Sequence, residues 1–233
     1  MIGDVGVASS GRFGQYNTDR KASEIGTETA VQKWNSATPS VEERQQQKRD
    51  ILIREAGAAF GRNGFHHTTL EEVASNIGIT KAAIYYYFQN KNEILFECHK
   101  LAIRVAGDAL ELAETRGQTG YEKLCLTIRC YIVGLTSELS YFSILVDVSD
   151  LEPQQREYVV QYRDKFEVKL RRFVKEGILD GSIAPCDPKF AIFVLMGAVS
   201  WVPSWYSPTG KLSGEKIADK LIEIVSRGIL PRS

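Results

Sequence analysis

Two lysines stand where helices are expected to start, and this placement is chemically unusual. Lys81 follows Thr80 and Lys91 follows Asn90, and both preceding residues favour N-cap positions. A cation in the first turn opposes the helix dipole, at a cost of about 0.3–1 kcal/mol. Free backbone N–H groups beside a lysine make a binding site for a phosphate. We therefore expect both lysines to contact the phosphates of a nucleic acid, the alternative being solvated side chains without a role.

The residues between the two lysines suit a helix that enters a groove of DNA. Ala82 and Ala83 have small side chains, which would let the exposed start of this helix approach the bases closely. An alanine can also contact a thymine methyl group. Three consecutive tyrosines cannot all face the core of so short a helix. We expect some of their hydroxyls to point outward as phosphate donors, including at least one of Tyr85 and Tyr86, the alternative being plain packing.

Two short helices are predicted on either side of Gly78, which suits a left-handed helix end. Thr69 suits the N-cap of the first helix and forms a capping box with Glu72. Apolar residues follow at i, i+3, i+4 and i+7 along this helix. Thr80 suits the N-cap of the second helix, over 81–87. Two short helices across a tight turn are the architecture of a helix-turn-helix.

The composition excludes several other classes of protein. The formal net charge is zero, so any grip on DNA must come from a few well-placed groups. Four cysteines and three histidines show no metal-ligand spacing, and no nucleophile elbow or phosphate-binding glycine motif is present. We therefore expect no enzyme, no cofactor and no metal. Because no signal peptide or membrane span is recognised, a cytoplasmic protein with reduced thiols is predicted.

The whole pattern predicts an all-α protein, because no alternating strand pattern or hairpin turn is found. We expect a flexible extension over 1–40, a three-helix helix-turn-helix domain over 41–90, and a helical ligand-binding and dimerisation domain over 91–233. A short helix is also predicted around 141–148. The other helices are predicted over 42–62, 70–77, 81–87, 91–116, 121–138, 154–179, 187–202 and 214–228.

From Arg44 to about Phe96 the sequence resembles the TetR family of one-component repressors. The resemblance is carried by "GFHHTTL", "EEVASNIGITKAAIYYYF" and "QNKNEILFE". It implies an all-α homodimer that binds a near-palindromic operator and is released by a ligand in its C-terminal half. Positions that contact the DNA backbone in this family match Thr69, Thr80, Lys81, Tyr85, Tyr86 and Lys91, and base-facing positions match Ala82 and Ala83. Ala83 departs from the hydroxyl residue common there, which leaves shape and methyl contacts for recognition.

The ending "SWVPSWYSPTGKLSGEKIADKLIEIVSRGI" resembles that of TetR-type regulators that respond to acyl-CoA thioesters. An acyl group needs an apolar tunnel and the CoA phosphates need a cation. The candidate tunnel residues are Tyr131, Phe142, Trp201 and Trp205, and the candidate cations are Arg104, Arg129 and Arg163. The resemblance also places the helices near 187–202 and 214–228 in the dimer interface, where a nearly continuous apolar segment begins. Core packing and ordinary surface pairing are the alternatives for these residues.

Three functions therefore compete on the sequence alone. The first is a repressor released from DNA by a small molecule, either an acyl-CoA thioester or a drug-like or aromatic compound. The second is a helix-turn-helix protein that binds DNA without an effector. The third, an enzyme with a helix-turn-helix appended, has no catalytic motif to support it.

Overall fold

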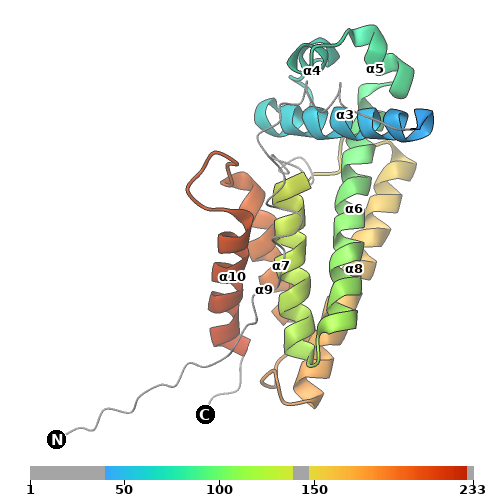
Figure 1. The fold of residues 1–233 in the computed structure, drawn as a ribbon. Coiled ribbons are helices and arrows are strands. Elements are labelled where there is room, and N and C mark those ends of the chain that lie inside the picture. The colour runs from blue at the N-terminus through green and yellow to red at the C-terminus, as the bar shows by residue number, and fades with distance from the viewer. Residues whose placement is uncertain (1–39, 139–146, 230–233) are drawn as a thin grey trace, which may run out of the picture.

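The computed structural model describes residues 40–138 and 147–229, and all regular elements in these ranges are helices (Figure 1). The predicted all-α fold is confirmed. The extension at 1–39, Phe142 and most of the short helix expected at 141–148 lie outside the described residues. The helices are α3 (Val41–Asn63), α4 (Leu70–Asn76), α5 (Lys81–Tyr87), α6 (Lys91–Arg116), α7 (Gly120–Glu138), α8 (Pro153–Leu179), α9 (Pro188–Trp201), the 3₁₀ turn η2 (Val202–Ser204) and α10 (Gly214–Ile229).

The local signals around Gly78 produce the predicted pair of helices, with one difference. Gly78 has φ +68°, and Thr80 Oγ1 accepts a hydrogen bond from the backbone N–H of Ala83 at 3.2 Å. Thr69 Oγ1 accepts from the N–H of Glu72 at 3.2 Å, but the Glu72 carboxylate accepts from Asn63 Nδ2 at 2.6 Å. Glu72 therefore ties α4 to the end of α3, and the reciprocal half of the predicted capping box is replaced by this contact.

Helix α3 completes the helix-turn-helix domain from below (Figure 1). Its apolar side, including Leu52 and Phe60, is buried together with Val73 of α4 and Ile84 of α5. Gly64 ends α3 with φ +82°, and the chain folds back so that the Phe65 ring meets Phe60 at 5.2 Å. These contacts fix α4 and α5 at one end of the molecule.

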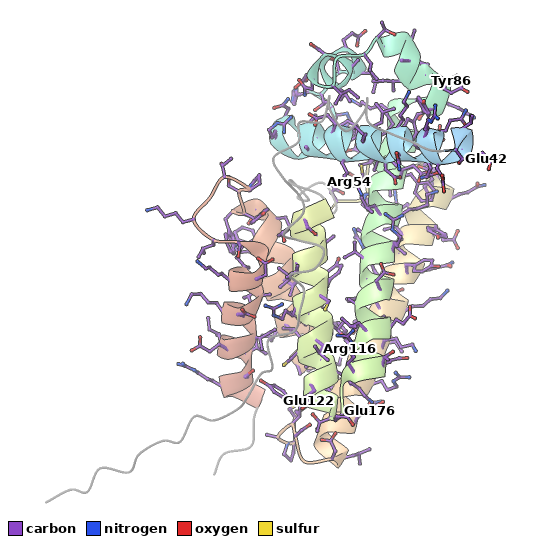
Figure 2. The ribbon with its side chains drawn as sticks, viewed as in Figure 1. Glu42, Arg54, Tyr86, Arg116, Glu122 and Glu176 are labelled. Carbon is purple, nitrogen blue, oxygen red and sulfur yellow. The ribbon has the colours of Figure 1, made fainter. Side chains whose placement is uncertain are left out.

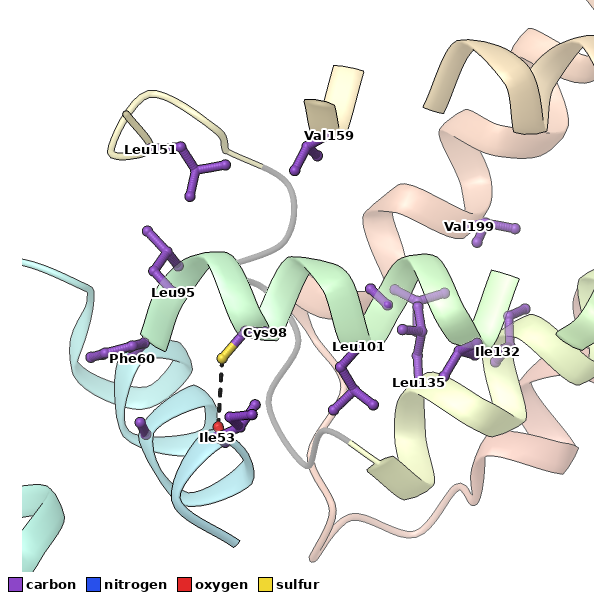
Figure 3. Packing of buried hydrophobic residues seen from close by; sticks show 14 of the residues in the cluster. Ile53, Phe60, Leu95, Cys98, Leu101, Ile132, Leu135, Leu151, Val159 and Val199 are labelled. Carbon is purple, nitrogen blue, oxygen red and sulfur yellow. Dashed lines mark hydrogen bonds between the residues drawn. The ribbon is translucent and has the colours of Figure 1, made fainter. Parts of the chain in front are cut away.

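The remaining helices form a bundle that packs against this domain through α6. α6 leaves the helix-turn-helix, packs on α3 and continues along α7 and α8, while α10 covers the other side of α7 (Figure 1). One hydrophobic cluster continues from Phe60 through Leu95 and Leu101 to Ile132 and Val199 (Figure 3). Within the described residues, no helix is long and apolar enough to cross a membrane.

The far end of the bundle depends on a close approach between α7 and α8 at Gly120. A Cβ atom on Gly120 would lie 2.0 Å from the backbone nitrogen of Gly177. Neither backbone can move away easily, because the Gly120 N–H also donates to Asp180 Oδ2 at 2.8 Å. We expect Gly120→Ala to destabilise the protein by about 3 kcal/mol, at the upper end for overpacking a helix contact. Thermal or urea denaturation followed by circular dichroism measures this.

Gly107→Ala is the matched control for that substitution. A Cβ on Gly107 meets nothing within 4 Å, and the residue lies inside α6. Alanine is therefore expected to stabilise the protein by about 0.5–1 kcal/mol, through helix propensity alone. A Gly120→Ala protein that unfolds like the wild type would contradict the packing described for this end of the bundle.

Candidate functional site

One exposed surface at the end of the molecule carries the predicted DNA-contacting side chains of α5. Tyr86 is 71% exposed and lies at the outer edge of the molecule, beyond α3 (Figure 2). Tyr85 and Ala82 are exposed beside it, whereas Ile84 is fully buried on the opposite face. Tyr86 Oη accepts a hydrogen bond from Gln45 Nε2 of α3 at 3.2 Å. The prediction that some of the three tyrosines face outward is confirmed by Tyr85 and Tyr86, and Tyr87 is the tyrosine that packs on the core.

Lys81 lies on this surface with its charge held by an exposed partner. Its Nζ is 2.5 Å from Glu71 Oε1 of α4 and 5.8 Å from the centre of the Tyr85 ring. The hydrogen bond with Glu71 raises the pKa of Lys81, so the side chain is a cation at any physiological pH. Exposed ion pairs of this kind contribute little to stability. The ammonium group can therefore exchange Glu71 for a stronger anion at small cost.

Lys91 is placed differently from Lys81. Its Nζ donates to the carbonyl oxygens of Phe65 and Thr68, and it lies 4.3 Å from the centre of the Phe65 ring. Burial lowers its pKa, although the charge of Asp150 opposes that effect. The side chain thus fastens the turn between α3 and α4 to the start of α6. Its predicted contact with a phosphate stays a prediction.

A largely apolar cavity of about 540 Å³ lies in the bundle, lined by α6, α7, α8 and α9. This volume is within the range of sites that hold drug-sized ligands. The Tyr131 and Phe166 rings meet at 5.2 Å on its wall. The apolar lining consists of Ala102, Ile103, Ala106, Leu110, Tyr131, Leu135, Val159, Phe166, Phe193, Met196, Val199 and Pro203.

Charged side chains line the cavity mainly from α8. Arg163, Lys165 and Lys169 are exposed cations of this helix, and Asp164 and Glu167 are its anions. Lys169 Nζ is 3.2 Å from Glu114 Oε1 of α6. The α8 side therefore offers more cations than anions to a ligand that enters between the helices.

His99 is the titratable side chain that α6 contributes to the described cavity wall. It is 2% exposed, and its Nε2 has no hydrogen-bond partner within the described part of the chain. Desolvation, followed by the charge of Arg163, lowers the pKa of His99 to about 4, although Asp147 opposes this. The imidazole is therefore neutral at physiological pH.

The cavity and the helix-turn-helix are joined through the first turns of α6. Arg49 of α3 donates to the carbonyl oxygen of Tyr87 and to Glu97 Oε1, both at 2.7 Å. Cys98 Sγ donates to the carbonyl oxygen of Ile53 at 3.5 Å (Figure 3). These bonds connect α3, the end of α5 and α6. Arg49 therefore links the first turns of α6, where His99 begins the cavity wall, to the end of α5.

The family to which the chain belongs follows from two matches with family models. Residues 52–98 match "Bacterial regulatory proteins, tetR family", and residues 117–229 match "Tetracyclin repressor-like, C-terminal domain". Together the matches span both the helix-turn-helix and the bundle. The chain belongs to the TetR family. Its members are DNA-binding transcription factors and not enzymes.

Individual TetR-family proteins resemble the chain over most of its length. The HTH-type transcriptional repressor KstR2 of Mycolicibacterium smegmatis is 24% identical over 194 residues, covering 78% of this chain and 90% of the relative. The crystal structure of PfmR from Thermus thermophilus has a TM-score of 0.69 at 26% identity, covering 78% of this chain and 99% of PfmR. AibR, solved in complex with isovaleryl coenzyme A and operator DNA, has a TM-score of 0.64 at 24% identity, covering 76% and 96%.

Only part of the predicted ligand set lines the cavity of this TetR-family chain. Tyr131 and Arg163 are on its wall. Arg129 Nε is 2.9 Å from Asp219 Oδ1, so it bridges α7 to α10. Arg104 lines a separate hollow of about 200 Å³ between α3 and α6. Trp201 and Trp205 are exposed and absent from the cavity lining, and Phe142 lies outside the described residues.

Sequence reasoning missed the individual residues of α6 that line the cavity, above all His99. His99, Ile103, Ala106 and Leu110 are spaced i, i+4, i+7 and i+11, which places them on one face of the helix. That stripe was a usable signal. It shows which residues share a face, whereas the Arg129–Asp219 pair joins residues 90 positions apart and leaves no local pattern.

Proposed function

We propose that this protein is a homodimeric repressor that leaves its operator when an acyl-CoA thioester binds in the cavity of the bundle. The observation that carries the proposal is the apolar cavity with cations along α8, in a chain whose other end presents a helix-turn-helix surface. A ligand releases DNA by binding better to a conformation in which the two helix-turn-helix domains of the dimer no longer fit successive major grooves.

The DNA-binding roles follow from exposure and charge on α4 and α5. Lys81 contacts a phosphate after exchanging Glu71, and Tyr85 and Tyr86 donate their hydroxyls to neighbouring phosphates. Thr69 and Thr80, the exposed N-caps of α4 and α5, are proposed to contact the DNA backbone with them. Ala82 and Ala83 face the bases, where small apolar side chains allow close approach and contact thymine methyl groups. Lys91 supports the turn beside this surface.

The dimer is proposed to form through α9 and α10. Phe190, Val194, Gly197 and Trp201 repeat at i, i+4, i+7 and i+11 on α9, and all four are exposed. Ile224 is exposed in the same way on α10. A continuous apolar stripe of this kind marks a protein interface, and a second copy of the chain covers it. A Cβ on Gly197 would meet nothing within 4 Å, which leaves room for the partner helix.

The acyl-CoA assignment rests on the cavity and on one neighbour. Apolar walls suit an acyl chain, while Arg163, Lys165 and Lys169 suit the CoA phosphates. AibR, which shares the fold, was solved with isovaleryl coenzyme A and operator DNA. The Tyr131–Phe166 pair favours the second candidate, an aromatic or drug-like effector, because aromatic rings stack on such walls.

Operator release provides the test. DNA sites selected by the protein from a random library are labelled, and binding is followed by fluorescence anisotropy with isovaleryl-, octanoyl- and palmitoyl-CoA. At least one thioester is expected to weaken DNA binding about tenfold or more, corresponding to about 1.4 kcal/mol of coupling. Free CoA and the free acids are the ligand controls.

A pair of lysine variants tests whether the CoA phosphates bind at the cations of the cavity lining. Lys165→Ala removes a cation of the cavity lining, whereas Lys175→Ala removes an exposed lysine of α8 that is not part of that lining. Only Lys165→Ala is expected to raise the thioester concentration needed for release. Release by aromatic compounds alone would favour the second candidate. DNA binding that no compound changes would point to a regulator without an effector.

A further inference from the structure

We propose that His99 is the polar recognition point of the cavity, selecting an effector that places an uncharged oxygen, such as a keto or hydroxyl group, within its apolar part. His99 lines the cavity from α6, and its Nε2 is buried without a partner in the described residues. The inference rests on the proposed function only in taking this cavity as the effector site. It adds the chemistry by which the effector is chosen.

An unpartnered buried nitrogen needs a reason in a folded protein. Most buried polar atoms are hydrogen-bonded, because losing water without a replacement costs free energy. His99 is 2% exposed, so bulk water does not satisfy the ring in the folded chain. Its neighbours on the same face of α6, Ile103 and Ala106, have no side-chain polar atoms to offer. A ligand atom in the cavity supplies the missing partner.

The charge state of His99 indicates which partner fits. Burial and Arg163 of α8 both hold its pKa down, to about 4, with Asp147 before α8 acting in the opposite direction. A neutral imidazole offers one N–H donor and one acceptor nitrogen. A keto oxygen accepts a hydrogen bond from Nε2 when that nitrogen carries the proton, and a hydroxyl group can pair with Nε2 in either tautomer. A cationic group would be repelled by Arg163, and a carboxylate would pair with that arginine more strongly than with a neutral imidazole.

Of the three cations proposed for the CoA phosphates, Arg163 acts on His99, whereas Lys169 lies further along α8. Lys169 lies six residues after Arg163, about 9 Å further along the α8 axis. An effector that reaches both ends is therefore apolar in its middle, anionic near Lys169 and carries an oxygen near His99. Among acyl-CoA thioesters, the geometry favours those whose acyl group bears a keto or hydroxyl substituent.

The same turn of α6 contacts the DNA-binding domain. Cys98, next to His99, donates to the carbonyl oxygen of Ile53 in α3 (Figure 3). A ligand bonded to His99 thus acts one residue away from a contact that positions α3. The turn of α6 that would recognise the ligand oxygen is therefore also the turn that contacts the helix-turn-helix domain.

The test uses the full-length protein with two probes, 1-indanone and indane, which differ in one carbonyl oxygen. Dissociation constants are measured by calorimetry for the wild type and for His99→Leu. We expect His99→Leu to shift the ratio of the two constants by about tenfold against indanone, the effect of one hydrogen bond lost in an apolar site. His99→Gln retains a side-chain N–H and is expected to restore part of the preference.

Met196→Leu is the matched control, because Met196 lines the cavity without a hydrogen-bonding role. It is expected to change the affinity for both probes by the same factor. In the wild type, indanone and not indane is expected to shift the ¹⁵N signals of His99, a readout that needs no variant. The proposal is overturned by an unchanged ratio in His99→Leu, by unmoved ¹⁵N signals, or by failure of both probes to bind.

The outcomes for the two proposals can be told apart. If His99 discriminates the probes but no thioester releases DNA, the effector class is wrong and the recognition point stands. If thioesters release DNA while His99→Leu leaves the ratio of the two dissociation constants unchanged, the proposed function stands and this inference fails.

Discussion

Ala82→Glu is expected to lower operator affinity by about 100-fold or more while leaving the fold intact. Ala82 is exposed in the first turn of α5, on the surface proposed to face DNA. A carboxylate there is repelled by the phosphates and blocks close approach to the bases. A loss of about 1.4 kcal/mol in each half-site multiplies to about 100-fold over a palindromic operator. Anisotropy with library-selected DNA measures it.

Ala82→Glu is expected to lower operator affinity without lowering the stability of the fold. A glutamate in the first turn of a helix favours the helix dipole, so the melting temperature is expected to stay the same or rise slightly. Gln154→Glu is the matched control, because Gln154 is exposed at the equivalent second position of α8 and receives the same charge. Equal losses of affinity in both variants would show that net charge, and not the surface of α5, determines DNA binding.

The helices were predictable because their ends are encoded locally. The predicted ranges 81–87 and 91–116 coincide with α5 and α6, since Thr80 and Asn90 each accept a bond from a backbone N–H three residues later. Gly78 adopts the predicted positive φ. Such signals depend on neighbours in sequence and need no knowledge of the tertiary fold.

The outward direction of Tyr85 and Tyr86 was predictable for a similar reason. A seven-residue helix has one buried face, and Ile84 occupies it. The contacts of Lys91 were not predictable, because they depend on the turn at Phe65 and Thr68, more than 20 residues earlier. The same first-turn placement therefore gives Lys81 an exposed anion and Lys91 two carbonyl oxygens.

The cavity shows the limit of sequence reasoning most clearly. An arginine on an amphipathic helix gives no sign of whether its partner is a ligand or another helix. Arg129 pairs with Asp219 of α10, and Arg104 lies toward α3, while Arg163 lines the cavity. The choice depends on how helices distant in sequence cross, which the periodicity of one helix does not encode.

Val194→Glu is expected to convert the protein from a dimer to a monomer. Val194 is 69% exposed in the described chain and lies in the middle of the apolar stripe on α9. A solvated glutamate costs an isolated monomer almost nothing. In the proposed dimer the carboxylate would be buried in each copy without a counter-charge, which costs several kcal/mol. The molecular mass measured by analytical ultracentrifugation is expected to fall from twice 26.1 kDa to 26.1 kDa.

Loss of the dimer also removes the second helix-turn-helix domain, so operator affinity is expected to fall by about 100-fold or more, as two half-sites become one. Val168→Glu is the matched control, because Val168 is an exposed valine of α8, 54% exposed and outside the α9 stripe. Its sedimentation and DNA binding are expected to match the wild type. If Val194→Glu stays dimeric while Val168→Glu dissociates, the interface lies on α8 and the exposed stripe of α9 requires another partner.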